Sequence, residues 1–112
     1  MSVLIKGGRI VTASDDYVAD IFIEKEQISL IGQNLKVQAD RVIDAKGKYV
    51  LPGAIDPHTH IEFPFGGTTT CDTWTSATTA AAAGGTTTVV DFCVQTPGKS
   101  LKHALDAWHG KM

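Results

Sequence analysis

The residues best suited to chemistry in this chain are His58 and His60, which lie in the segment Asp56–His60 (DPHTH). The apolar run Tyr49–Leu51 and the pair Ala54-Ile55 come before them, as expected of a strand. Side chains two positions apart in a strand point to the same side of the pleat. Two neutral imidazoles on one side can bind one metal ion, and imidazole is a common ligand of zinc. The spacing therefore predicts a metal site at a strand end.

A catalytic metal needs more donors than this pair supplies. Catalytic zinc commonly has about three protein ligands and an open position for water, which then becomes a nucleophile near neutral pH. The alternative is that His58 and His60 are ordinary polar residues at a strand end. The preceding segment Pro52–Asp56 (PGAID) favours the metal site, because it defines how the strand begins. We expect the remaining ligands after Met112 and identify no catalytic residue within this chain.

Two aspartates each have two possible roles, and the other polar residues show no pattern that indicates a function. Asp56 either orients a neighbouring ligand or satisfies backbone N–H groups at the strand end. Asp91, late on the next predicted strand, is either a buried, hydrogen-bonded carboxylate or a catalytic group. His103 and His109 have no second ligand at a usable spacing, so we expect exposed helix residues. Gly84–Thr88 (GGTTT) precedes a strand rather than a helix, which argues against a phosphate loop.

Residues 1–51 are predicted to form short strands without chemistry of their own. Strands are expected at 3–5, 10–12, 18–23, 27–31, 41–43 and 49–51. The segment Lys6–Arg9 (KGGR) is predicted to be a tight turn between the first two strands, because glycine accepts a positive φ. No sustained helical periodicity occurs here, so we expect a β-sheet layer.

Near Pro52 the pattern changes to alternating strands and helices. Asp72 is predicted to be the N-cap of a helix that Gly84-Gly85 ends. One face of this helix carries residues at i, i+3, i+4 and i+7, namely Trp74, Ala77, Thr78 and Ala81. A strand buried on both faces is expected at 86–92, and Ser100 is predicted to begin a second helix.

The order strand–helix–strand–helix predicts an α/β fold. It implies parallel strands with right-handed crossovers. A (β/α)8 barrel takes about 250 residues and carries its catalytic groups where strands end, which is where His58 and His60 lie. We therefore expect residues 52–112 to be the first two βα units of such a barrel, and the chain to be the N-terminal part of a longer protein.

The composition is that of a globular protein. The 112 residues are 43% hydrophobic and 20% charged, with a formal net charge of -2. This balance gives no argument for nucleic acid or an anionic membrane as a partner, and no segment has the length of a membrane span. Cys71 and Cys93 fit neither a CxxC motif nor a disulfide framework. We expect reduced thiols in a cytoplasmic protein, with Cys93 buried and Cys71 exposed in a loop.

Several segments resemble a known family. Leu51–His60 (LPGAIDPHTH) resembles the first-strand signature of the amidohydrolase superfamily. Phe63–Thr68 (FPFGGT) and Ala80–Phe92 (AAAAGGTTTVVDF) resemble, more specifically, the cyclic-amide hydrolases of the dihydropyrimidinase or D-hydantoinase type. The segments Ile5–Thr12 and Val42–Gly47 extend this resemblance over essentially the whole chain.

The resemblance implies a two-part fold and a metal centre. Residues 1–51 would belong to a composite β-sandwich domain, and residues 52–112 would begin the barrel. His58 and His60 would bind one zinc of a two-zinc centre, with manganese as the alternative metal. A carboxylated lysine, further histidines and an aspartate beyond Met112 would complete the site.

The resemblance also implies a reaction. Water activated by the metals would open the ring of a hydantoin or dihydropyrimidine to give an N-carbamoyl amino acid. The full-length protein would be a homotetramer or homodimer, and the 112-residue chain alone is expected to be inactive.

The loop after His60 separates relatives within the superfamily. Dihydroorotase-like and allantoinase-like members commonly carry Arg or a Glu-Pro-Gly sequence here, and a carboxylated ring favours a guanidinium partner. Residues 61–71 contain no Arg or Lys. Phe63 and Phe65 are therefore expected to line a pocket for an uncharged ring. The alternative is that these aromatic side chains only pack the loop.

Three other functions stay open. The protein could be another cyclic amidohydrolase, such as an allantoinase or dihydroorotase, or a non-catalytic dihydropyrimidinase-like scaffold. Scaffold relatives usually lose metal ligands, whereas His58 and His60 are both present. A free-standing β/α binding module would leave unpaired strands and an Ala-rich helix face exposed, which argues against it.

Overall fold

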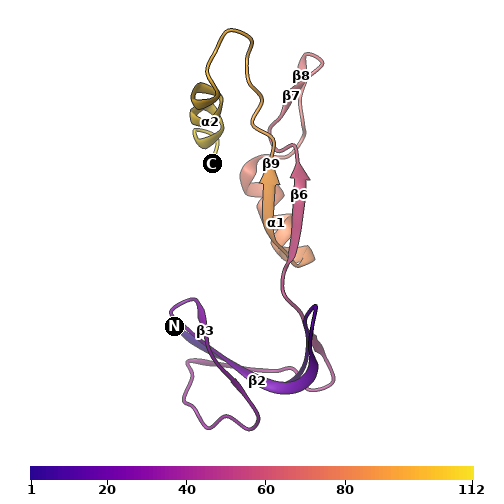
Figure 1. The fold of residues 1–112 in the computed structure, drawn as a ribbon, viewed down its shortest axis with the longest axis vertical. Helices are drawn as coiled ribbons and strands as arrows, with labels where there is room; N and C mark the ends of the chain where they lie inside the picture. The colour runs from indigo at the N-terminus through magenta and orange to yellow at the C-terminus, as the bar shows by residue number, and fades with distance from the viewer. The chain divides into compact units, whose positions relative to one another are not determined.

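The computed structural model describes all 112 residues as two compact units, Met1–Pro52 and Gly53–Met112 (Figure 1). The first unit contains only strands: β1 (Ser2–Val11), β2 (Asp16–Glu24), β3 (Gln27–Gly32), β4 (Arg41–Asp44) and β5 (Tyr49–Val50). The second is mixed: β6 (Ala54–Thr59), β7 (Pro64–Phe65), β8 (Thr68–Thr69), α1 (Trp74–Gly84), β9 (Thr86–Asp91) and α2 (Leu101–His109). No helix is long and apolar enough to cross a membrane.

The first unit is one sheet in the order β3-β2-β1-β4, with β5 also paired to β1. Strands β1, β2 and β3 run antiparallel, whereas β4 and β5 lie parallel to β1. Its small core consists of buried Ile10, Ala19 and Ile21, with Ile5, Ile23 and Val50 packed against them. The prediction of an all-strand first half is confirmed.

The predicted turn at Lys6–Arg9 is wrong, because β1 runs through it as one strand. The pairing with β2 shifts between Ile5 and Gly8, so two residues of β1 lie opposite one residue of β2. This is a β-bulge, and Gly7 has the positive φ of 66° that such an irregularity uses. The glycine pattern indicated a positive φ correctly, but a positive φ serves a bulge as well as a turn.

A buried carboxylate holds this bulge. Asp20 is only 5% exposed and accepts the backbone N–H of Gly7 at 2.8 Å. Its other oxygen accepts the backbone N–H of Leu35 at 2.9 Å, which fixes the loop after β3. The two bonds compensate for removing the charged carboxylate from water.

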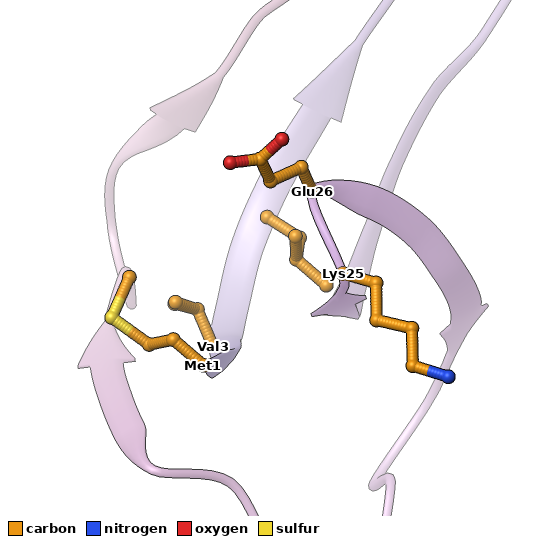
Figure 2. A pocket seen from close by; sticks show the side chains of 5 residues that line it. Met1, Val3, Lys25 and Glu26 are labelled. Carbon is orange, nitrogen blue, oxygen red and sulfur yellow. The ribbon is translucent and has the colours of Figure 1, made fainter.

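A cavity of about 470 Å³ in the first unit is lined by Met1, Val3, Ile23, Lys25 and Glu26 (Figure 2). The Lys25 side chain extends away from Met1 and Val3, so its ammonium does not face the apolar side chains. Lys25 and Glu26 are the titratable side chains in this lining, and the others are apolar.

The second unit contains a strand–helix–strand arrangement. Strands β6 and β9 pair in parallel, and α1 connects them in sequence (Figure 1). Helix α1 ends at Gly85, whose φ of 89° is left-handed. Ser100 is the N-cap of α2, accepting the N–H of His103. These helix and strand predictions are confirmed.

The N-cap of α1 is Thr73, so the prediction of Asp72 is wrong. The Thr73 hydroxyl accepts the N–H of Ser76, and the Ser76 hydroxyl accepts the N–H of Thr73, which forms a capping box. Asp72 instead accepts the Ser76 hydroxyl at 2.9 Å. Both residue types favour this position, and only the reciprocal partner at Ser76 selects the threonine.

Two burial predictions in the second unit are wrong. The strand at 86–92 is not covered on both faces, since Val90 is 50% and Phe92 is 44% exposed. Cys93 is exposed rather than buried, while Cys71 is exposed as predicted. Of the two helices only α1 packs along β9, and a strand is buried on both faces only when a layer covers each face.

Replacing Asp20 tests its role in the first unit. Asp20→Ala leaves the N–H groups of Gly7 and Leu35 without their acceptor, and we expect it to lower the free energy of unfolding by about 2 kcal/mol. Urea titration measures this loss. The matched control is Asp16→Ala, which removes a carboxylate from an exposed ion pair with Arg9 and should change stability much less. Equal losses in the two variants would contradict the assignment.

Candidate metal centre

The structure brings the two imidazoles of His58 and His60 together at the end of β6. Their Nε2 atoms are 3.1 Å apart, and the rings are inclined at 68°. Two nitrogens that each lie about 2.0–2.1 Å from a tetrahedral zinc are separated by roughly 3.3 Å. The observed separation therefore suits two ligands of one ion, and the donor type suits zinc.

Two phenylalanines pack against this pair. The Phe92 ring centroid lies 4.3 Å from that of His58 and 5.2 Å from that of His60. Phe63 contacts His60 edge-on, with centroids 4.6 Å apart. The apolar rings restrict how the imidazoles can turn. Sequence reasoning missed Phe92, although its place directly after the parallel strand β9 puts it beside the end of β6.

Asp56 satisfies the backbone rather than an imidazole. Its Oδ1 accepts the backbone N–H of His58 at 3.2 Å. Of the two interpretations, the one in which Asp56 serves N–H groups at the strand end is therefore confirmed.

Asp91 is a hydrogen-bonded carboxylate, as one of its two interpretations expects, but it is partly rather than fully buried. One oxygen accepts the hydroxyl of Thr59 and the backbone N–H of Ile61, each at 3.0 Å. The other oxygen accepts the indole N–H of Trp108, on α2, at 2.7 Å. These bonds join the end of β9 to the residues before and after His60 and to α2.

A short hairpin follows His60. Strands β7 and β8 pair Pro64 with Thr69 and Phe65 with Thr68. At its base, the Thr70 hydroxyl donates to the carbonyl of His60 at 2.9 Å and accepts the N–H of Phe63 at 2.9 Å. The hairpin is thus tied directly to the backbone of a predicted ligand.

The two aromatic residues of this loop behave differently. Phe63 is partly buried against His60, and its ring also lies near Trp108 at a centroid distance of 6.2 Å. Phe65 is 76% exposed. Phe63 thus contacts its neighbours in this region, whereas the Phe65 side chain is open to solvent.

Glu62 links this loop to α1. Its side chain accepts the N–H of Trp74 at 3.1 Å, at the start of the helix, where a negative charge is favourable. Its backbone carbonyl accepts the ammonium of Lys111 at 2.7 Å. Glu62 has a φ of 49°, so this corner of the chain is tightly turned.

The remaining predicted site residues lie outside the pair. His103 and His109 are exposed on α2, as predicted. No group of three or more His, Cys, Asp or Glu residues that could hold a metal ion occurs in the structure. His58 and His60 thus offer two potential donors, fewer than the roughly three protein ligands that a catalytic zinc commonly has.

A parallel βα unit whose first strand ends in two convergent imidazoles is typical of metal-dependent barrel hydrolases. The sequence model described as "Amidohydrolase family" matches residues 41–110. This chain belongs to the amidohydrolase family, which is generally metal-dependent.

Known relatives narrow the comparison. The chain is 55% identical over 111 residues to the D-hydantoinase of Geobacillus stearothermophilus, covering 99% of this chain and 24% of that protein. It is 42% identical over 110 residues to the dihydropyrimidinase of Rattus norvegicus, covering 94% of this chain and 21% of that protein. The crystal structure of dihydropyrimidinase from Brevibacillus agri NCHU1002 matches with a TM-score of 0.95 at 51% identity, covering 99% of this chain and 24% of the other. The chain thus spans about a quarter of the length of these relatives.

The bond between the Thr70 hydroxyl and the backbone N–H of Phe63, at the base of the hairpin, can be tested by hydrogen exchange. Thr70→Val keeps the side-chain shape but removes the hydroxyl that accepts the N–H of Phe63. We expect exchange of the Phe63 amide to become about fivefold to tenfold faster, as the loss of about 1 kcal/mol predicts. Thr75→Val on α1, whose hydroxyl makes no such bond, is the control. Unchanged exchange in Thr70→Val would show that the hydroxyl does not hold the hairpin base.

Proposed function

We propose that this chain forms the N-terminal part of a metal-dependent hydrolase that opens a hydantoin or dihydropyrimidine ring to an N-carbamoyl amino acid. The observation that carries the proposal is the 3.1 Å approach of the two Nε2 atoms at the end of β6. Similarity to proteins named D-hydantoinase and dihydropyrimidinase supports the substrate class.

In this proposal His58 and His60 hold one metal ion, zinc or alternatively manganese, of a two-metal centre. A bound metal supplies an activated water and polarises the ring amide carbonyl. This chain fixes the orientation of the two imidazoles, because Phe92 packs against both rings and Asp56 holds the backbone N–H of His58. The other ligands and the residue that moves the proton belong to parts of the protein outside these 112 residues.

The two units take separate parts in the proposed protein. Residues 1–51 supply strands of a composite β-sandwich domain, and residues 52–112 supply the first two βα units of a (β/α)8 barrel. The open edges of β6 and β9 support this, since each strand of a closed barrel has two neighbours. A homotetramer or homodimer of the full-length protein is part of the same proposal.

The loop after His60 favours an uncharged ring as substrate. Residues 61–71 contain no Arg or Lys to pair with a ring carboxylate. Phe65, which is 76% exposed, is placed to contact the substituent of the ring. We therefore favour a hydantoinase or dihydropyrimidinase over a dihydroorotase, and the retained histidine pair favours an enzyme over a scaffold.

The metal ligands can be tested in the full-length protein. Loss of a residue that only supports a ligand typically costs about 10–100-fold, so loss of a ligand itself should exceed that. We expect His58→Ala and His60→Ala each to lower kcat/KM for ring opening by more than about 100-fold and to reduce the bound metal. Metal content is measured by mass spectrometry and ring opening of dihydrouracil or hydantoin by ultraviolet absorbance.

His103→Ala, which removes an exposed histidine on α2, is the matched control and should retain metal and activity. Full metal content in His58→Ala and His60→Ala would reject the proposed centre. The 112-residue chain alone should open neither ring, and activity of that chain would contradict the need for further ligands.

The loop proposal predicts a change of selectivity. Phe65→Arg in the full-length protein would place a guanidinium within hydrogen-bonding reach of a ring carboxylate. We expect the ratio of kcat/KM for dihydroorotate over dihydrouracil to rise about tenfold, as one charge-assisted hydrogen bond allows. Phe65→Leu, which removes the ring without adding charge, separates the effect of charge from that of size. An unchanged ratio in Phe65→Arg would place Phe65 outside the substrate pocket.

A further inference from the structure

We propose that Asp91 is a positioning residue that sets the geometry of the His58–His60 pair, and that Trp108 on α2 is its partner. The proposal rests on the proposed metal function of the two histidines. It adds that the relative placement of the two Nε2 atoms depends on a carboxylate from the neighbouring strand and on the following helix.

Asp91 holds the backbone on both sides of His60. The residues on both sides of it are bound to one atom, because Asp91 Oδ1 accepts the hydroxyl of Thr59 and the N–H of Ile61. The chain between these two bonds consists of His60 alone. Rotation of the backbone there breaks at least one bond to the carboxylate, so Asp91 restrains the direction in which the His60 side chain leaves the strand.

Phe92 holds the imidazole rings of His58 and His60. Phe92, the residue after Asp91, packs against both rings, and its backbone N–H donates to the carbonyl of Thr59 at 3.2 Å. The last residue of β9 and the residue that follows it thus hold the backbone beside His60 and the faces of both imidazoles. A shift of Asp91 is expected to carry Phe92 with it and to change the separation of the two Nε2 atoms.

The Asp91 side chain must accept hydrogen bonds at both of its oxygens, which requires a carboxylate. Asp91 Oδ2 accepts the indole N–H of Trp108 at 2.7 Å, and Trp108 is only 7% exposed. Donors therefore approach both oxygens of the same side chain. A carboxylate accepts at both oxygens, whereas an amide presents one acceptor and one donor and can satisfy only one side.

Helix α2 is fixed to the same region by a second contact. Lys111 lies 4.0 Å from the centroid of the Trp108 indole and donates to the carbonyl of Glu62. The helix is thereby joined to the loop that follows His60 as well as to Asp91. The position of α2 is in this way coupled to the backbone that presents the second imidazole.

The test compares Asp91→Asn, Trp108→Phe and the double variant of the full-length protein, reconstituted with Co²⁺. We expect Asp91→Asn to raise the Kd for Co²⁺ by about tenfold, the lower end of the range for residues that orient a ligand, and to shift the visible absorption of the bound ion. Trp108→Phe keeps an aromatic ring and should have a smaller effect. In the double variant no indole N–H opposes the amide, so its Kd should lie below that of Asp91→Asn.

Asp20→Asn is the matched control, because Asp20 also bridges two donors but lies in the first unit. We expect it to lower stability and to leave the Co²⁺ affinity and absorption unchanged. If Asp91→Asn does not fold, Thr59→Val removes one donor to the same oxygen and should shift the Co²⁺ absorption in the same direction.

The role of Asp91 and the metal proposal can be rejected separately. Loss of Co²⁺ in His58→Ala together with wild-type affinity and absorption in Asp91→Asn would overturn the role of Asp91 and leave the metal proposal standing. Undiminished Co²⁺ binding in His58→Ala and His60→Ala would overturn the metal proposal itself and the role of Asp91 with it.

Discussion

The second unit depends on one side chain that gathers donors from three parts of the chain. The carboxylate of Asp91 binds Thr59 at the end of β6, Ile61 in the loop and Trp108 in α2. A two-stranded parallel sheet has few ladder bonds of its own, so contacts of this kind define how the strand ends meet. Asp20 has the same function in the first unit, where it ties a bulge to a distant loop. In both units a partly or fully buried carboxylate satisfies backbone groups that no strand partner reaches.

Much of the local structure could be predicted from the sequence because its causes are local. Strand periodicity puts His58 and His60 on one side, and the Gly84-Gly85 pair and Ser100 mark helix ends by their own backbone preferences. The errors lie where the same sequence pattern fits two local structures. Asp72 and Thr73 can each cap a helix, and glycine at position 7 suits a turn or a bulge.

The contacts that hold the candidate site could not be predicted because they join residues far apart in sequence. The partners of Asp91 lie 30 and 17 positions away from it, at Ile61 and Trp108. The sequence therefore left open whether Asp91 was structural or catalytic, and it gave no sign that Phe92 packs against both imidazoles. Burial was overestimated for the same reason, since it depends on which elements, distant in sequence, pack over each face of a strand.

The hairpin after His60 is constrained at its two ends in different ways. Its base is fixed by Thr70, which bonds to His60 and Phe63, while Gly66 and Gly67 at its tip have positive φ values of 60° and 81°, which residues with side chains rarely adopt. A substitution at the tip would therefore strain the turn, whereas a change at Thr70 would loosen the backbone of His60 and Phe63. Homologues should therefore vary little at both ends of this hairpin, at the tip because of backbone conformation and at the base because of hydrogen bonding.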